Sequence, residues 1–163
     1  MKLAFEVFAW AFFAAVVGLL SVWPRYDTIE KDHAMVTVTF SHAANRIGEC
    51  RTLTQEELNQ LPPNMREPSE CPRERHPVRI ELRSDDAVLY REVLAPSGIW
   101  SDGKANIYRR IIVPARTHDL FVGMNDSGDE DGFDFEGSRR IDIAPGRNVV
   151  VRFDEQLQKF SIQ

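Results

Sequence analysis

The sequence lacks the motifs by which many enzymes are recognised. It contains no Gly-x-Ser-x-Gly nucleophile elbow, no phosphate-binding glycine loop and no Cys-x-x-Cys-His haem attachment site. It also lacks a basic excess, because 25 aspartates and glutamates outnumber 20 lysines and arginines. Nucleic-acid binding needs a basic face, so we expect no nucleic acid as partner. We predict a protein that is not an enzyme, with no catalytic residues and no cofactor.

Cysteine is scarce, and the histidines are dispersed. Cys50 and Cys71 lie too far apart for the Cys-x-x-Cys spacing that tunes a thiolate for redox chemistry. An even number of cysteines in an exported protein favours a disulfide, so we predict a structural bridge between them. Such a bridge contributes on the order of 3 kcal/mol in the chain-entropy model. No histidine pair has metal-ligand spacing, so no metal site is predicted. The histidines are His33, His42, His76 and His118.

One long hydrophobic run is present, at the start of the chain. Residues 3–23 are apolar apart from Glu6, and about 20 such residues in a helix cross a hydrocarbon core of roughly 30 Å. A cleaved signal peptide is the alternative, but its apolar core is shorter and ends at a small-x-small site, which this run lacks. Trp10 and Trp23 suit the two membrane interfaces. We predict an uncleaved transmembrane signal-anchor over residues 1–24.

The charges near this run predict its orientation. Lys2 and the amino terminus are the cations at the front end, so the positive-inside rule places the N-terminus in the cytoplasm. Residues 25–163 then form the exported domain. In a bacterium this is a periplasmic domain on a single-pass inner-membrane anchor. Glu6 within the span costs a few kcal/mol unless it is paired or near the interface, which favours a neighbouring helix as partner.

The exported region has the pattern of β-structure. Val36, Val38 and Phe40 alternate with Thr37 and Thr39, which is the period of a strand with one buried face. The predicted strands are residues 34–41, 78–82, 87–94, 105–113, 119–124, 141–143, 149–153 and 160–162. No helical crossover lies between them, so we expect no parallel pair. Short strands joined by turns predict an antiparallel β-sandwich, immunoglobulin-like or transthyretin-like, over residues 25–163.

A long connection, residues 42–77, interrupts this pattern. The predicted disulfide brackets much of it. Thr54 and Glu57 have the spacing of a capping box, which predicts a short helix over residues 55–61 that stops before Pro62. Long ordered loops on rigid scaffolds often carry function, so we expect this insert and the apolar helix to form the contact surface for a partner.

The insert is mixed in charge, which suits protein contacts because arginine pairs carboxylates with bidentate geometry. Pairing of these charges within the insert, where they would serve folding alone, is the alternative. The charged residues are Arg46, Arg51, Arg66, Arg73 and Arg75, with Glu49, Glu56, Glu57, Glu67, Glu70 and Glu74.

Residues 125–136 form an acidic, glycine-containing loop. Its spacing of acids partly fits an EF-hand, with Ser127 at the first position. Ser138 then stands where Ca²⁺ needs a bidentate glutamate, and no flanking helices are predicted. We expect a solvated turn that its charges keep soluble. The sequence does not decide whether this loop binds Ca²⁺.

Two resemblances add to this reading. Residues 113–122 and the Pro-Gly hairpin at residues 143–149 resemble the hairpins of transthyretin-like and PEGA-type β-sandwich modules. That resemblance covers the last third of the chain and implies the fold alone. The segments at residues 41–43, 48–51, 61–66 and 71–75 resemble a group of uncharacterised, membrane-anchored periplasmic proteins of proteobacteria. This second resemblance implies a compartment and no activity.

Two functional hypotheses follow. The first is a structural or accessory subunit of a larger integral membrane protein complex, with respiratory or photosynthetic electron transfer as the first system to test. Its partners would be that complex and the lipid bilayer. The second is a tethered periplasmic assembly factor that binds a metal or another ligand, which predicts a cluster of His, Met and acidic residues at one end of the sandwich.

Overall fold

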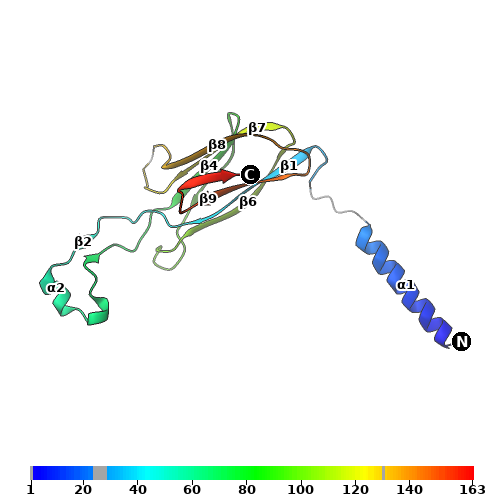
Figure 1. Cartoon of the computed structure of the whole chain (residues 1–163), viewed down its shortest axis with the longest axis horizontal. Coiled ribbons are helices and arrows are strands. Elements are labelled where there is room, and N and C mark those ends of the chain that lie inside the picture. The colour runs from blue at the N-terminus through cyan, green and yellow to red at the C-terminus, as the bar shows by residue number, and fades with distance from the viewer. Residues whose placement is uncertain (1, 24–28, 130) are drawn as a thin grey trace. The chain divides into compact units, whose positions relative to one another are not determined.

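The computed structural model describes residues 2–23, 29–129 and 131–163 (Figure 1). The chain divides into two compact units, Met1–Glu30 and Lys31–Gln163. The predicted boundary between Pro24 and Arg25 lies outside the described residues.

The first unit is a single helix, α1 (Lys2–Val22), of 21 residues. At 1.5 Å per residue it is about 31 Å long, which matches the hydrocarbon thickness of a bilayer. None of its residues is buried against protein. A helix satisfies its backbone hydrogen bonds internally, so an apolar one is stable in lipid. The protein therefore has one N-terminal helix long and apolar enough to span a membrane.

The second unit contains two four-stranded sheets (Figure 1). The first sheet has the strand order β10-β9-β1-β6, and the second has the order β5-β4-β7-β8. Their strands are β1 (His33–His42), β4 (Val78–Ser84), β5 (Ala87–Leu94), β6 (Ala105–Pro114), β7 (Thr117–Asn125), β8 (Phe135–Asp142), β9 (Asn148–Asp154) and β10 (Lys159–Ile162). The predicted mainly β fold is confirmed.

The apolar faces of the two sheets form one core. In β1 the predicted inward residues Val36 and Val38 are fully buried, and in β4 the same holds for Ile80 and Leu82. Because side chains alternate across a strand, each strand adds every second residue to this core. The buried set also includes Ala34, Phe40, Val78, Ile107, Val113, Leu120, Val122, Met124, Ile143, Val149, Val151, Phe153 and Ile162.

One strand pair departs from the antiparallel pattern. Strand β9 pairs with β1 in parallel, with Val36 opposite Val149 and Val38 opposite Val151. The expectation of no parallel pair was therefore wrong. A parallel pair needs a crossover connection, and here the connection from β1 to β9 runs through the insert, all four strands of the second sheet and β6.

Strand β8 is longer than the sequence predicts. It starts at Phe135, within the predicted acidic loop, and ends at Asp142, so Ile143 lies beyond it. Its first part, residues 135–140, escapes detection because the inward positions there include Gly137 and Arg139 in place of apolar residues. Gly137 is required there, since a Cβ would lie 2.7 Å from the Cβ of Phe160.

An edge strand of one sheet meets an edge strand of the other at two places, β8 with β10 and β5 with β6. At each place an arginine occupies a core-facing position of its strand. Arg139 of β8 donates a hydrogen bond to the carbonyl of Ile162 in β10. At the second place, the Nε of Arg109 in β6 lies 3.3 Å from the Tyr90 hydroxyl and 3.8 Å from a Glu92 carboxylate oxygen, both in β5. Both arginines are exposed. Charges on edge strands oppose pairing with other chains, so these contacts protect the sandwich edges.

A buried carboxylate lies on the outer face of the second sheet. Glu81 has a side chain only 5% exposed, and it accepts hydrogen bonds from Arg91, at 2.6 Å, and from Arg83. The hydrogen bond from Arg91, followed by that from Arg83, lowers the pKa of Glu81 against the opposing effect of burial. Two strands, β4 and β5, are thereby joined by side chains as well as by backbone.

We predict that Glu81→Gln lowers the free energy of unfolding by about 1–2 kcal/mol at pH 7, because both arginines lose a charged acceptor while remaining partly solvated. A folded-state pKa below the unfolded value of about 4.3 stabilises the fold above that pH, and this contribution disappears as pH falls through the folded pKa. Urea melts from pH 7 to pH 3 should show a flatter acid limb for the variant. Glu92→Gln, at the longer Arg109 contact, is the control and should change stability little; equal effects from both would contradict the prediction.

Candidate functional site

The irregular segments gather at one end of the sandwich. Strand β1 ends there at His42, which pairs with Ala105 at the start of β6. Four groups of residues project from this end (Figure 1). They are the insert, the β5–β6 loop (residues 95–104), residues 126–129 and 131–134, and the β9–β10 turn (residues 155–158). The chain enters the sandwich at the opposite end, at His33.

The insert has secondary structure of its own. It contains β2 (Arg51–Thr52), α2 (Gln55–Gln60), the 3-10 turn η1 (Pro63–Met65) and β3 (Ser69–Glu70), with β2 paired to β3. The predicted capping box is confirmed: the Thr54 hydroxyl accepts from the Glu57 N–H, and the Glu57 carboxylate accepts from the Thr54 N–H at 2.8 Å. None of α2 is buried, so its caps rather than a core define it.

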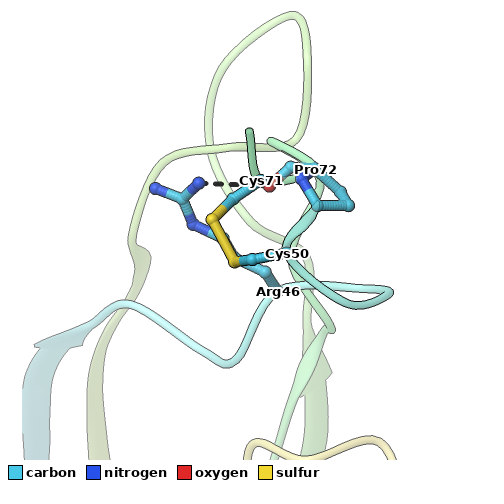
Figure 2. Close-up of a disulfide and its surroundings, with 4 residues drawn as sticks. All are labelled: Arg46, Cys50, Cys71 and Pro72. Carbon is cyan, nitrogen blue, oxygen red and sulfur yellow. Dashed lines mark hydrogen bonds between the residues drawn. A yellow bond between two sulfur atoms is a disulfide. The ribbon is translucent and has the colours of Figure 1, made fainter. Parts of the chain in front are cut away.

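The Cys50–Cys71 disulfide is present, as predicted, at the base of the β2–β3 ribbon (Figure 2). Beside it, an Nη1 of Arg46 donates to the Pro72 carbonyl at 3.2 Å. Gly48 adopts φ of +94°, and a Cβ there would meet the Pro72 ring at 3.3 Å. The two arms of the insert are thus held together covalently and by packing.

Arg75 fastens the insert to the sandwich. Its N–H donates to the Ser101 carbonyl at 3.0 Å, and its guanidinium donates to the carbonyls of Asp102 and Ala44. The neighbouring backbone closes the same junction, because the His76 N–H donates to the Asn45 carbonyl at 2.9 Å. The two ends of the insert and the β5–β6 loop therefore share one set of hydrogen bonds.

A surface pocket of about 900 Å³ lies between the insert and this junction. Arg51 lies in its wall and pairs with Glu57 at 2.6 Å and with Glu70 at 3.0 Å. The hydrogen bond from the Thr54 backbone, and then that from Arg51, lowers the pKa of Glu57 to about 2. The pocket residues are Arg46, Arg51, Leu53, Glu57, Gln60, Leu61, Met65, Glu67, Ser69, Glu70, Cys71, Arg73, Arg75 and Asp102.

The charges of the insert divide into two groups. Arg51 and Arg75 are engaged within the protein, as the folding alternative predicted. By contrast, the side chains of Arg73 and Glu67 line the pocket and make no ion pair or hydrogen bond within residues 2–23, 29–129 and 131–163. A rigid frame thus surrounds charged groups that a partner can engage.

Two acids of the predicted acidic loop, Asp126 and Asp134, are held by hydrogen bonds. Asp126 is 4% exposed, and Asp134 accepts hydrogen bonds from the N–H groups of Asp126 and Ser127 and from the Ser127 hydroxyl, at 2.7–3.0 Å. Burial opposes ionisation of Asp134, but these donors together lower its pKa. The expectation of a solvated turn was wrong for Asp126, which is buried, whereas Asp134 is exposed and its carboxylate is held by these donors.

An aromatic contact holds the same loop against the second sheet. Phe133 lies over Gly123, where a Cβ would approach its ring to 2.5 Å, and its ring centroid is 5.8 Å from that of Phe121. The guanidinium of Arg83 lies 5.2 Å from the Phe121 centroid and 6.0 Å from that of Phe133. The absence of a side chain at Gly123 thus creates the place where the loop packs.

The dispersed histidines do not converge on a site. Among the described residues no three His, Cys, Asp or Glu side chains are placed to hold a metal ion. His42 contacts Asp126 at 2.7 Å, and His76 lies against Gly128. His118 contacts the Ser84 hydroxyl at 2.6 Å and the Pro114 carbonyl at 2.8 Å.

Two buried histidine contacts went unpredicted although the sequence carries a signal for each. His42 extends the inward series of β1, and His118 extends that of β7, so period two places both inside. Both ring nitrogens of His118 are engaged, and Ser84 and His118 are at most 4% exposed. The Ser84–His118 contact is therefore a structural link between strands, closed to a substrate.

No protein-family model matches the chain, and no curated protein matches it. The class of the protein is thus defined by its structure: a β-sandwich with an N-terminal apolar helix and a disulfide-linked insert.

We predict that Cys50→Ser/Cys71→Ser loosens the insert while the two sheets still form. Removing the bridge returns on the order of 3 kcal/mol of chain entropy to the unfolded insert, so its local opening becomes more frequent. Trypsin should cleave after Arg66 faster than in the parent protein, and the melting temperature should fall. Unchanged cleavage with an unchanged melting temperature would contradict a structural role.

Asp134→Ala should destabilise the protein by about 1–3 kcal/mol, because the buried N–H of Asp126 loses its acceptor. Amide hydrogen exchange at Asp126 and Ser127 should accelerate. The matched control is Asp129→Ala, whose exposed side chain has no described partner, and it should leave exchange unchanged. Equal exchange in both variants would show that Asp134 does not order the loop.

Proposed function

We propose that this chain is a non-catalytic accessory subunit of a larger membrane protein complex. In this proposal α1 anchors the chain, and the insert end of the sandwich contacts the partner. The observation that carries the proposal is the pocket beside the insert, where a disulfide, a capped helix and Arg75 hold a rigid frame around unengaged charges.

The contact geometry supports protein recognition over a single charged ligand. Arg73 and Glu67, of opposite sign, are both available at the pocket, so a partner surface with both charges is complementary. Ordering of the frame before binding also reduces the entropy that a complex would cost. A preformed contact surface is the arrangement expected of a permanent subunit.

The compartment is part of the proposal. The spanning helix, the disulfide and the placement of Lys2 support a single-pass protein of the bacterial inner membrane, with the N-terminus in the cytoplasm and the sandwich in the oxidising periplasm.

Respiratory and photosynthetic electron-transfer complexes are the first assemblies to test. The support is the aromatic surface of α1, where Phe5, Phe8 and Trp10 are at least 71% exposed and suit a neighbouring helix, lipid or pigment. The alternative is a tethered periplasmic assembly factor that binds a metal or another ligand; among the described residues no three His, Cys, Asp or Glu side chains are placed to hold a metal ion.

The experiment replaces residues 44–75 by a short glycine-containing connection in the full-length, membrane-inserted chain. The partner complex should no longer co-purify in mild detergent, because the frame of the pocket is gone. The matched control keeps the insert and carries Arg140→Gln, which changes an exposed arginine of β8 outside the pocket and should retain binding. Retained co-purification after the replacement would remove the insert from the interface and leave α1 as the contact.

A further inference from the structure

The tip of the β5–β6 loop presents two large apolar side chains to solvent. Ile99 is 95% exposed and Trp100 is 69% exposed. Isoleucine is among the residues most often found inside proteins, and tryptophan is also highly buried on average. An adjacent pair so fully exposed therefore marks a surface that a partner can cover.

The loop that carries this pair is fixed in place. Within it the Gly103 N–H donates to the Ser97 carbonyl at 2.8 Å, and the Ser101 N–H donates to the Gly98 carbonyl at 3.2 Å. Gly98 and Ser101 flank the pair in left-handed conformations, with φ of +94° and +51°. Left-handed backbone at a non-glycine residue persists only when the surrounding structure enforces it.

The loop is continuous with the proposed interface. The carbonyls of Ser101 and Asp102 accept hydrogen bonds from Arg75, which closes the base of the insert. Asp102 and Arg75 also line the pocket beside the insert. One partner surface can therefore contact the insert and the loop tip together.

We propose that Ile99 and Trp100 are the hydrophobic anchor of the docking surface, and that they insert into an apolar pocket of the partner protein. This inference rests on the proposed function and names the residues that would dominate binding energy. Tryptophan is enriched among such hot spots, which lie in apolar centres surrounded by polar rims.

Charge favours a protein over a lipid surface as the occupant. The groups around the tip carry both signs, as in the Lys104–Glu155 pair at 2.8 Å, and the chain has a net charge of −5. Loops that dock on anionic bilayers need clustered basic residues, whereas a mixed rim is typical of protein interfaces. A loop fixed before binding also suits a complementary pocket.

The test compares Ile99→Ser/Trp100→Ser with Val93→Ser/Tyr108→Ser in the full-length chain. Val93 and Tyr108 are exposed to a similar degree, 61% and 60%, and lie on strands β5 and β6, outside the loop. We expect the first variant to reduce co-purification of the partner complex about tenfold or more, as for hot-spot residues, and the second to retain it. Equal co-purification of the partner complex with both variants would overturn the proposed role of Ile99 and Trp100.

Two measurements make this result specific. Melting temperatures equal to that of the parent show that the variants fold; if the double change does not fold, Trp100→Ser with rescue by Trp100→Phe replaces it. A photo-crosslinking p-benzoylphenylalanine in place of Trp100 should label one polypeptide of the co-purified complex, and the same group in place of Tyr108 should not. Labelling of a second copy of this chain, or equal labelling from both positions, would overturn the proposal.

Lipid is tested as the competing occupant. In a Trp10→Phe/Trp23→Phe background Trp100 is the remaining tryptophan, because the chain has three. We expect no quenching of its fluorescence when the full chain is reconstituted in phosphatidylethanolamine–phosphatidylglycerol vesicles that contain brominated acyl chains. Strong quenching would show that the loop tip contacts the bilayer, and it would overturn the proposal that Ile99 and Trp100 dock into a protein.

Different results disprove the docking role of Ile99 and Trp100 and the proposed function of the chain. In one outcome the insert replacement abolishes co-purification while Ile99→Ser/Trp100→Ser does not. In that case the proposed contact of Ile99 and Trp100 is wrong, and the proposal of an accessory subunit is unaffected. If neither change affects co-purification, both the anchor and the insert interface are wrong.

Discussion

The structure depends on the burial of strand β1 at the centre of the first sheet. It pairs with β6 on one side and β9 on the other, and its alternate residues fill the core between the sheets. A shift of one residue would turn Val36 and Val38 outward, so the hydrophobic effect fixes the register. That register also sets which residues reach the far end of the sandwich, where His42 contacts Asp126 and the insert begins.

From this end outward, the interactions that hold the structure change in kind. The sandwich is held by apolar burial, whereas the insert buries none of its α2 residues and relies on a disulfide, a capping box and arginine–carbonyl hydrogen bonds. A segment without a core gains order only from such local links. The consequence is a rigid projection whose outer groups are not needed for folding, which is the physical basis for proposing it as a contact surface.

Several predictions from sequence held because they depend on local periodicity or on backbone chemistry. Alternation located β1, β4, β6, β7 and β9, and the spacing of Thr54 and Glu57 located α2. Prediction failed where a strand's inward positions are not apolar. Gly137 and Arg139 concealed β8, since their places are decided by contacts with Phe160 and Ile162 from β10. The parallel β1–β9 pair escaped for a related reason, because pairing between strands over 100 residues apart leaves no local pattern.

The sequence by itself determined an apolar helix long enough to span a membrane, a mainly β domain, a disulfide and a capped helix in the insert. Each of these follows from composition or from residues close together in the chain. Only the tertiary structure decided that Arg75 links the insert to the β5–β6 loop, that Asp134 orders the acidic loop, and that Ile99 and Trp100 stay exposed. These features depend on which loops share one end of the sandwich, and that is set by strand order and register, which are long-range consequences of packing two sheets face to face.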